Sequence, residues 1–113
     1  MNDIYQARID EQINSLFANM QGRIPDEDMV RVREAYAFAA EAHKEQRRKS
    51  GEPYVMHPLA VARIVAEELG LGAEPIIAAF LHDVVEDTDY TVEDIRERFG
   101  DDVAFLVDTG TKR

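Results

Sequence analysis

Residues 75–88 decide the fold of this chain, and they read Pro-Ile-Ile-Ala-Ala-Phe-Leu-His-Asp-Val-Val-Glu-Asp-Thr. A helix turns by about 100° per residue, which places His82, Asp83, Glu86 and Asp87 within about 140° of one another on one face. The other face is apolar and carries Ile77, Phe80, Leu81, Val84 and Val85. We therefore expect a buried helix that holds a polar quartet at its edge.

The rest of the chain predicts further helices on both sides of this segment. Apolar residues at helical spacing indicate a helix over about residues 3–20, and Asp26 is the expected N-cap of a second helix that runs to about Gln46. Pro58 and Pro75 are expected to open the third and fourth helices, and the third is expected to end at residues 70–72. Residues 91–94 predict a capping box before a fifth helix that stops at Gly100, and Asp101 or Asp102 is expected to cap a sixth. The predicted fold is an all-α bundle of about six helices.

Composition limits the class of protein. With 113 residues the chain is expected to be one domain, and its 45% hydrophobic and 32% charged residues are typical of a globular protein. Cysteine is absent, which excludes disulfides and thiolate metal sites. No segment has the pattern of a signal peptide or a membrane span, so we expect a cytoplasmic protein with no membrane partner. The net charge of −10 argues against binding to DNA.

The polar quartet suits a divalent metal. His82 and Asp83 offer an imidazole nitrogen and a carboxylate oxygen, and His57 could offer a second imidazole; such a set fits Mn, Fe, Zn or Mg. Glu86 and Asp87, on the same face, could accept a proton from an attacking water and orient it. The structural alternatives are a buried His82–Asp83 hydrogen-bonded pair and a solvated acidic helix end.

Basic residues concentrate at one place in this acidic chain. Lys44, Arg47, Arg48 and Lys49 lie at the end of the second predicted helix and lead into a loop that contains Ser50. Favourable interaction with the helix dipole explains Lys44 and to some extent Arg47. It explains Arg48 and Lys49 less well, because these lie in the loop that leads to His57. An arginine and a lysine there could bind phosphate.

Two strings make the sequence similar to a known family. They are Arg-Lys-Ser-Gly-Glu-Pro-Tyr at residues 48–54, followed by His57-Pro58, and Phe-Leu-His-Asp-Val-Val-Glu-Asp-Thr at residues 80–88. Together they resemble the hydrolase domain of the RelA/SpoT homologue family, within the HD phosphohydrolase superfamily. The resemblance covers about residues 35–113.

The resemblance implies an all-helical enzyme that removes pyrophosphate from the 3′ position of guanosine tetra- and pentaphosphate (ppGpp and pppGpp), with Mn²⁺ as the usual metal. Carried over by position, the metal ligands would be His57, His82 and Asp83. Glu86 and Asp87 would be the catalytic acidic pair. The guanine nucleoside side of the pocket would be lined by Arg48, Lys49 and Ser50.

The chain departs from the family pattern in two respects. The family has a fourth metal ligand, an Asp on a later helix, and the sequence stops at Arg113 before any such segment. The family also often has glycine directly after a Val-Asp pair, whereas here Thr109 follows Asp108 and the glycine comes at position 110.

We therefore expect residues 1–113 to be a single, partial hydrolase domain from a longer protein with synthetase and regulatory domains. We expect this chain alone to bind metal weakly and to hydrolyse little. Two other interpretations remain open: an HD phosphohydrolase that acts on another nucleotide, such as the 2′-phosphate of NADPH, and a non-catalytic module that binds alarmone.

Overall fold

Helices make up most of the chain in the computed structural model, which describes the backbone of residues 2–111 and the side chains of residues 4–110. The segments are α1 (Asn2–Met20), α2 (Asp26–Ala42), α3 (Met56–Arg63), the π-helical turn η1 (Ile64–Glu68), α4 (Ala73–Asp87), α5 (Val92–Phe99) and α6 (Asp101–Thr111). Within residues 2–111 there is no β-strand, and Arg47 and Pro53 form one isolated bridge. The prediction of an all-α bundle with six α-helices is confirmed.

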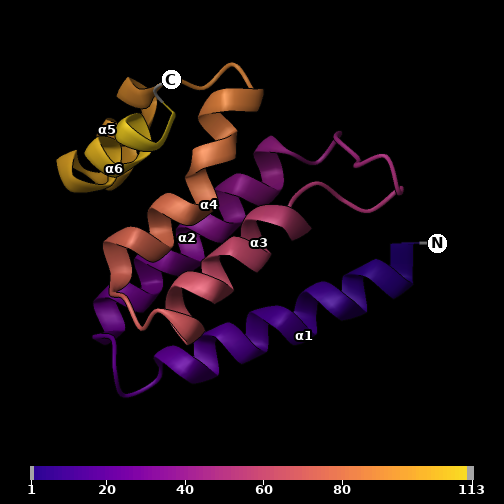
Figure 1. Ribbon diagram of the computed structural model, residues 1–113, viewed down its shortest axis with the longest axis horizontal. Helices are drawn as coiled ribbons and strands as arrows, with labels where there is room; N and C mark the ends of the chain where they lie inside the picture. Colours follow the sequence, from indigo (N-terminus) through magenta and orange to yellow (C-terminus); the bar gives the residue numbers. More distant parts are fainter. Residues whose placement is uncertain (1, 112–113) are drawn as a thin grey trace.

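Helix α4 lies at the centre of the bundle, in contact with α2, α3 and α6 (Figure 1). Its apolar face packs inward as the sequence pattern predicts, because Ile77, Phe80, Leu81 and Val84 are all fully buried. Val85 is partly buried beside them. The polar quartet is therefore held on a helix whose other face is fixed by the core.

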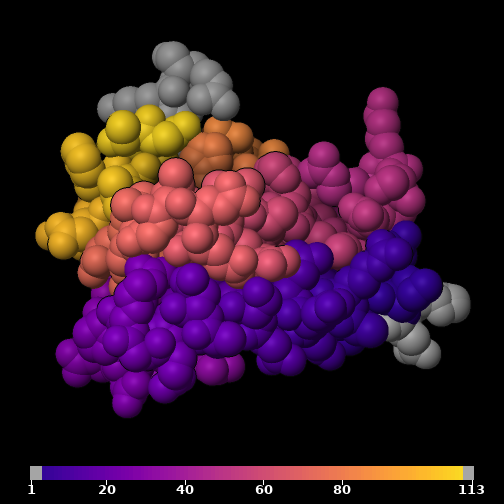
Figure 2. Space-filling model, turned by 60° about the horizontal axis from the view of Figure 1, so that its bottom comes forward, coloured from indigo at the N-terminus to yellow at the C-terminus, as the bar shows by residue number. Residues whose placement is uncertain are grey.

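Helix α1 packs along α3 and η1 and covers one side of the molecule (Figure 2). Its inner face buries Leu16 and Met20 completely. At the upper right of Figure 2, the loop between α2 and α3 projects from the body of the protein. This loop carries the basic residues that the sequence singles out.

The boundaries of α2 differ from those predicted. Pro25, and not Asp26, occupies the N-cap position, and no side chain caps this end. The helix ends at Ala42 instead of Gln46, because the Lys44 and Gln46 N–H groups bond to the carbonyls of Glu41 and His43, three residues back. The Gln46 side chain then reaches the carbonyl oxygen of Asp87, the last residue of α4.

The two prolines lie inside the first turns of their helices instead of opening them. Helix α3 begins at Met56 and α4 at Ala73, each two residues before the proline. A proline is accommodated there because the first N–H groups of a helix have no partner within the helix. His57 consequently lies in the first turn of α3, on helical backbone.

The ends of α5 agree with the prediction. Thr91 and Asp94 exchange side-chain hydrogen bonds with each other's backbone N–H groups and form the capping box. Gly100 follows the helix with φ of 98°, a conformation that favours glycine. No helix in the described part of the chain is long and apolar enough to cross a membrane.

Candidate functional site

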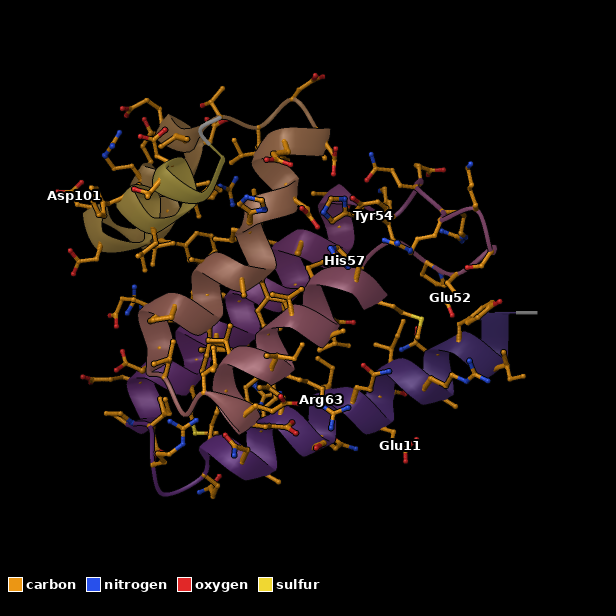
Figure 3. The ribbon with its side chains drawn as sticks, in the orientation of Figure 1. Glu11, Glu52, Tyr54, His57, Arg63 and Asp101 are labelled. Atoms are coloured by element: carbon orange, nitrogen blue, oxygen red, sulfur yellow. The ribbon has the colours of Figure 1, made fainter. Side chains whose placement is uncertain are left out.

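Asp83 is the centre of the predicted metal site. Its carboxylate lies between two imidazoles: Oδ2 is 3.3 Å from His57 Nε2, and Oδ1 is 3.3 Å from His82 Nδ1. The Asp83 side chain is 13% exposed, whereas that of His57 is 43% exposed. Asp83 therefore contacts both histidines that the resemblance names as ligands, His82 on α4 and His57 in the first turn of α3. Figure 3 labels His57.

Glu86 belongs to this cluster as well. Its Oε2 lies 3.6 Å from His82 Nε2, one helical turn away. Potential ligand atoms of His82, Asp83 and Glu86 all lie within 4.8 Å of one another. An imidazole with two carboxylates is a suitable donor set for a divalent cation, and a cation would offset the cost of holding these charges close together. His82, Asp83 and Glu86 therefore fit a divalent cation, whereas the predicted ligand His57 reaches this group only through its contact with Asp83.

The second ring nitrogen of His82 meets the end of α6. His82 Nε2 lies 2.9 Å from the carbonyl oxygen of Gly110. A Cβ at position 110 would come within 3.0 Å of His82 Cδ2, so the absence of a side chain at Gly110 allows this approach. A backbone carbonyl that accepts from a histidine fixes the ring orientation and the position of its proton. The glycine at position 110 thus contacts the predicted site directly.

Asp87, which follows Glu86 in the sequence, has hydrogen-bond partners from the segment between α2 and α3. The Tyr54 hydroxyl donates to Asp87 Oδ2 at 2.7 Å, and the Gln46 side-chain amide donates to the Asp87 carbonyl oxygen at 3.0 Å. The hydrogen bond to Asp87 is the main reason that the pKa of Tyr54 rises to about 12, with burial and the charge of Asp83 adding to it. The two acidic residues therefore have different partners.

The three predicted substrate-binding residues line one hollow. Arg48, Lys49 and Ser50 are exposed and, with Tyr54, surround about 470 Å³. A neighbouring hollow of about 310 Å³ has both Arg48 and His57 in its lining. The basic loop and the predicted metal ligand His57 are therefore neighbours on the surface.

The other two cations of the basic cluster serve the end of α2. Lys44 pairs with Glu41 at 2.7 Å, and Arg47 donates to the carbonyl oxygens of Lys44 and Gln46. The helix-end interpretation therefore suits Lys44 and Arg47. Arg48 and Lys49 face the hollow instead.

The sequence pattern assigns no role to Tyr54 and Gln46, which bond to Asp87, or to His43, which contacts both of them. His43 is 1% exposed, its Nδ1 bonds to Gln46 Oε1, and its ring lies 4.7 Å from that of Tyr54. The three-residue spacing of His43 and Gln46 was the available signal, although α2 ends before Gln46.

Known proteins with similar sequence or structure agree on the domain type. A model of the HD domain family matches residues 35–113. The guanosine-3′,5′-bis(diphosphate) 3′-pyrophosphohydrolase of Aquifex aeolicus (strain VF5) is 46% identical over 112 residues, 99% of this chain and 15% of that protein. The bifunctional (p)ppGpp synthase/hydrolase SpoT of Escherichia coli (strain K12) is 46% identical over 102 residues, 90% of this chain and 14% of that protein.

A solved structure gives the same result at the level of the fold. It is that of a metazoan orthologue of SpoT, described as hydrolysing ppGpp, with a TM-score of 0.72 and 37% identity over 81% of this chain and 52% of that one. The chain spans only 14–15% of the length of the two sequence relatives above. The resemblance to RelA/SpoT hydrolases is confirmed, and because the family model matches residues 35–113 of 113, the chain belongs to the HD domain family.

Proposed function

We propose that this chain is part of a hydrolase domain that removes the 3′-diphosphate of ppGpp and pppGpp and leaves GDP and GTP. One observation carries the proposal: His57, which lies 3.3 Å from Asp83, lines a hollow with Arg48, and Arg48 also lines the hollow of Lys49 and Ser50. Metal-binding groups next to a pair of phosphate-binding cations suit the hydrolysis of a phosphate ester. The names of the relatives support this substrate.

The metal ligands in this proposal are His57, His82 and Asp83, and the metal is Mn²⁺. When bound, a divalent ion supplies Lewis-acid stabilisation of phosphate oxygens and makes a water more acidic. Asp83 orients both imidazoles, because it lies 3.3 Å from each. Glu86 Oε2 lies 3.6 Å from His82 Nε2, where it can accept a proton from the attacking water.

The reaction breaks one phosphorus–oxygen bond and forms another. The oxygen of a water molecule bonds to the phosphorus attached to O3′ while the bond from that phosphorus to O3′ breaks. Pyrophosphate leaves with the water oxygen, O3′ takes up a proton, and Glu86 and Asp87 receive and orient the protons of the water. Arg48 and Lys49 offset the charge on the phosphate oxygens.

The basic loop is the feature that brings an anionic nucleotide to this chain. The net charge of −10 repels polyanions at a distance, so binding depends on local cations. Arg48 and Lys49 are exposed and line the hollow, whereas Lys44 is paired with Glu41. We propose that Arg48, Lys49 and Ser50 line the guanine nucleoside side of the pocket and that the two cations there also contact the phosphate oxygens.

The low coverage of the relatives supports a wider proposal about the protein. Residues 1–113 form a partial hydrolase domain of a longer cytoplasmic protein that also carries synthetase and regulatory domains, because the chain is 14% of the bifunctional enzyme from Escherichia coli. Sequencing of the surrounding reading frame tests this part.

Turnover of a nucleotide panel with Mn²⁺ tests the activity. The natural full-length product is incubated with ppGpp, pppGpp and NADPH, and release of pyrophosphate and phosphate is measured. We expect pyrophosphate from the two alarmones only. If phosphate is released from NADPH and no pyrophosphate is released from the alarmones, the proposed substrate is wrong. If the wild type has no turnover and Glu86→Gln still binds alarmone, the chain is a binding module.

A pair of charge variants tests the binding loop. Lys49→Ala is expected to weaken alarmone binding by about tenfold, as expected for the loss of one charge-assisted contact. Lys44→Ala is the matched control, since its ammonium pairs with Glu41 and lies outside the lining of the hollow. Equal weakening by both variants would contradict a specific role of the loop.

A further inference from the structure

Tyr54 joins the two halves of the proposed site. Its ring lines the hollow with Arg48, Lys49 and Ser50, and the Arg48 guanidinium carbon lies 5.9 Å from the ring centre. Its hydroxyl donates to Asp87 Oδ2 at 2.7 Å. One side chain therefore contacts both the predicted nucleotide loop and a predicted catalytic carboxylate 33 residues away in sequence.

Gln46 forms a hydrogen bond with the backbone of Asp87. Its amide nitrogen donates to the Asp87 carbonyl oxygen at 3.0 Å, and its own carbonyl accepts from the Tyr54 N–H at 3.2 Å. Asp87 is the last residue of α4, where helix carbonyls lack partners within the helix. Gln46 and Tyr54 are thus hydrogen-bonded to each other, and both bond to Asp87. Gln46 binds the Asp87 backbone, and Tyr54 binds the Asp87 carboxylate.

His43 forms the buried base of this arrangement. It is 1% exposed, and its ring packs against Tyr54 with 4.7 Å between centroids. Because the Gln46 amide nitrogen donates to Asp87, the Gln46 oxygen faces His43, so His43 Nδ1 carries the proton that it shares with that oxygen. The orientation of each group in the series is therefore set by the next.

We propose that Tyr54 is a positioning residue for Asp87, and that Gln46 and His43 support it. Tyr54 limits the Asp87 carboxylate to one rotamer and fixes its distance from the loop that binds the nucleotide. The carboxylate oxygen that does not bond to Tyr54 is then presented in one direction. This inference rests on the proposed hydrolase function and adds to it a residue to which the resemblance assigns no role.

A positioning role and a purely structural role predict different kinetics. If Tyr54 orients Asp87, its hydroxyl acts on the chemical step more than on binding. If it only stabilises the fold, its removal lowers the folded fraction and leaves the rate per folded molecule unchanged.

The kinetic test compares Tyr54→Phe with Tyr90→Phe in the natural full-length product. Each variant removes one hydroxyl and keeps the ring, and Tyr90 packs against Phe38, outside the site. We expect Tyr54→Phe to lower kcat for ppGpp by about tenfold, as for the loss of one hydrogen bond to a charged group, with KM within about twofold of wild type. We expect Tyr90→Phe to behave as wild type. Equal kcat in the two variants, or an effect on KM alone, overturns the positioning role.

Hydrogen exchange gives a readout that needs no turnover. The amide of Thr88, which bonds to the Val84 carbonyl, reports on the last turn of α4. We expect its exchange to become about tenfold faster in Tyr54→Phe and in Gln46→Met, and to stay unchanged in Tyr90→Phe. Unchanged exchange in both variants overturns the tether itself. If the wild type hydrolyses no alarmone while exchange responds, the proposed function fails and the tether stands as a structural feature only.

Discussion

At the scale of single residues, Gly110 is the place where the identity of one side chain decides the approach of two helices. Its carbonyl oxygen is 2.9 Å from His82 Nε2, and a Cβ at this position would lie 3.0 Å from His82 Cδ2. Contacts shorter than about 3.4 Å at a Cβ require the neighbour to move. His82 would be displaced from its orientation toward Asp83.

Gly110→Ala is therefore expected to weaken Mn²⁺ binding by about tenfold, the lower end of the effect of losing an outer partner of a metal ligand. The free energy of unfolding of the apo protein is expected to change by less than about 1 kcal/mol, because the helix propensity of alanine opposes the cost of moving His82. Metal titration by calorimetry and thermal denaturation measure the two quantities. Gly72→Ala is the control, since its Cβ would meet nothing within 4 Å. Equal metal affinity in both variants would contradict the argument.

Tyr54 gives a second prediction at this scale, on pH. Its pKa rises from 10.0 to about 12 in the folded protein, chiefly through the hydrogen bond to Asp87. Between these two values the folded state keeps a proton that the unfolded state loses. The contribution of Tyr54 to the free energy of unfolding is therefore fully present below pH 10 and is lost as the pH rises toward about 12. Urea denaturation across this window measures it. We expect the stability difference between wild type and Tyr54→Phe to shrink as pH rises, and a constant difference would refute the assignment.

At the scale of elements, the capping box of α5 is a feature that the sequence predicts and the structure confirms. The Asp94 N–H donates to Thr91 Oγ1 at 3.2 Å, and the Thr91 N–H donates to Asp94 Oδ2 at 2.9 Å. Helix α5 leads through Gly100 into α6, which carries Gly110 to His82.

Thr91→Ala is expected to lower the free energy of unfolding by about 1 kcal/mol, through the loss of one cap. Thermal denaturation of Thr91→Ala, Asp94→Ala and the double variant measures the coupling of the two residues. The double variant should lose less than the sum of the single losses, because each single change already breaks part of the reciprocal pair. Strict additivity would show that the two bonds do not act together.

Element positions could be predicted from sequence where local chemistry sets them. The apolar period of α4 and the Thr91–Asp94 spacing are local signals, and both agree with the structure. The end of α2 could not be predicted in this way. Residues 43–46 leave the helix by tight turns that carry the Gln46 side chain to Asp87, and that partner lies 41 residues away.

In the candidate site, too, only the features that local geometry sets could be predicted from the sequence. The face that holds His82, Asp83 and Glu86 follows from helical geometry alone. The hydrogen bond that Asp87 accepts does not, because the Tyr54 hydroxyl that donates it comes from another part of the chain. Motif spacing placed the residues of the site near one another, but only tertiary contacts assign each of them a partner.

At the scale of the whole molecule, the predicted metal site links α3 to α4. His57 lies in the first turn of α3, while His82 and Asp83 lie on α4, and the two helices pack against each other. A ligand that binds only the folded state stabilises all of it, so an ion at this position should raise the stability of the whole chain and not of one helix alone.

Mn²⁺ at about a hundred times its Kd is expected to raise the free energy of unfolding by about 2.7 kcal/mol. Asp83→Asn should lose most of this gain, because the carboxylate that lies 3.3 Å from both imidazoles is then uncharged. Asp89→Asn is the matched control, as Asp89 is exposed and lies beyond the end of α4. Thermal denaturation with and without Mn²⁺, followed by a chelator, measures the effect and its reversal. An equal Mn²⁺ gain in Asp83→Asn and Asp89→Asn would place the ion elsewhere, because the link between α3 and α4 passes through Asp83.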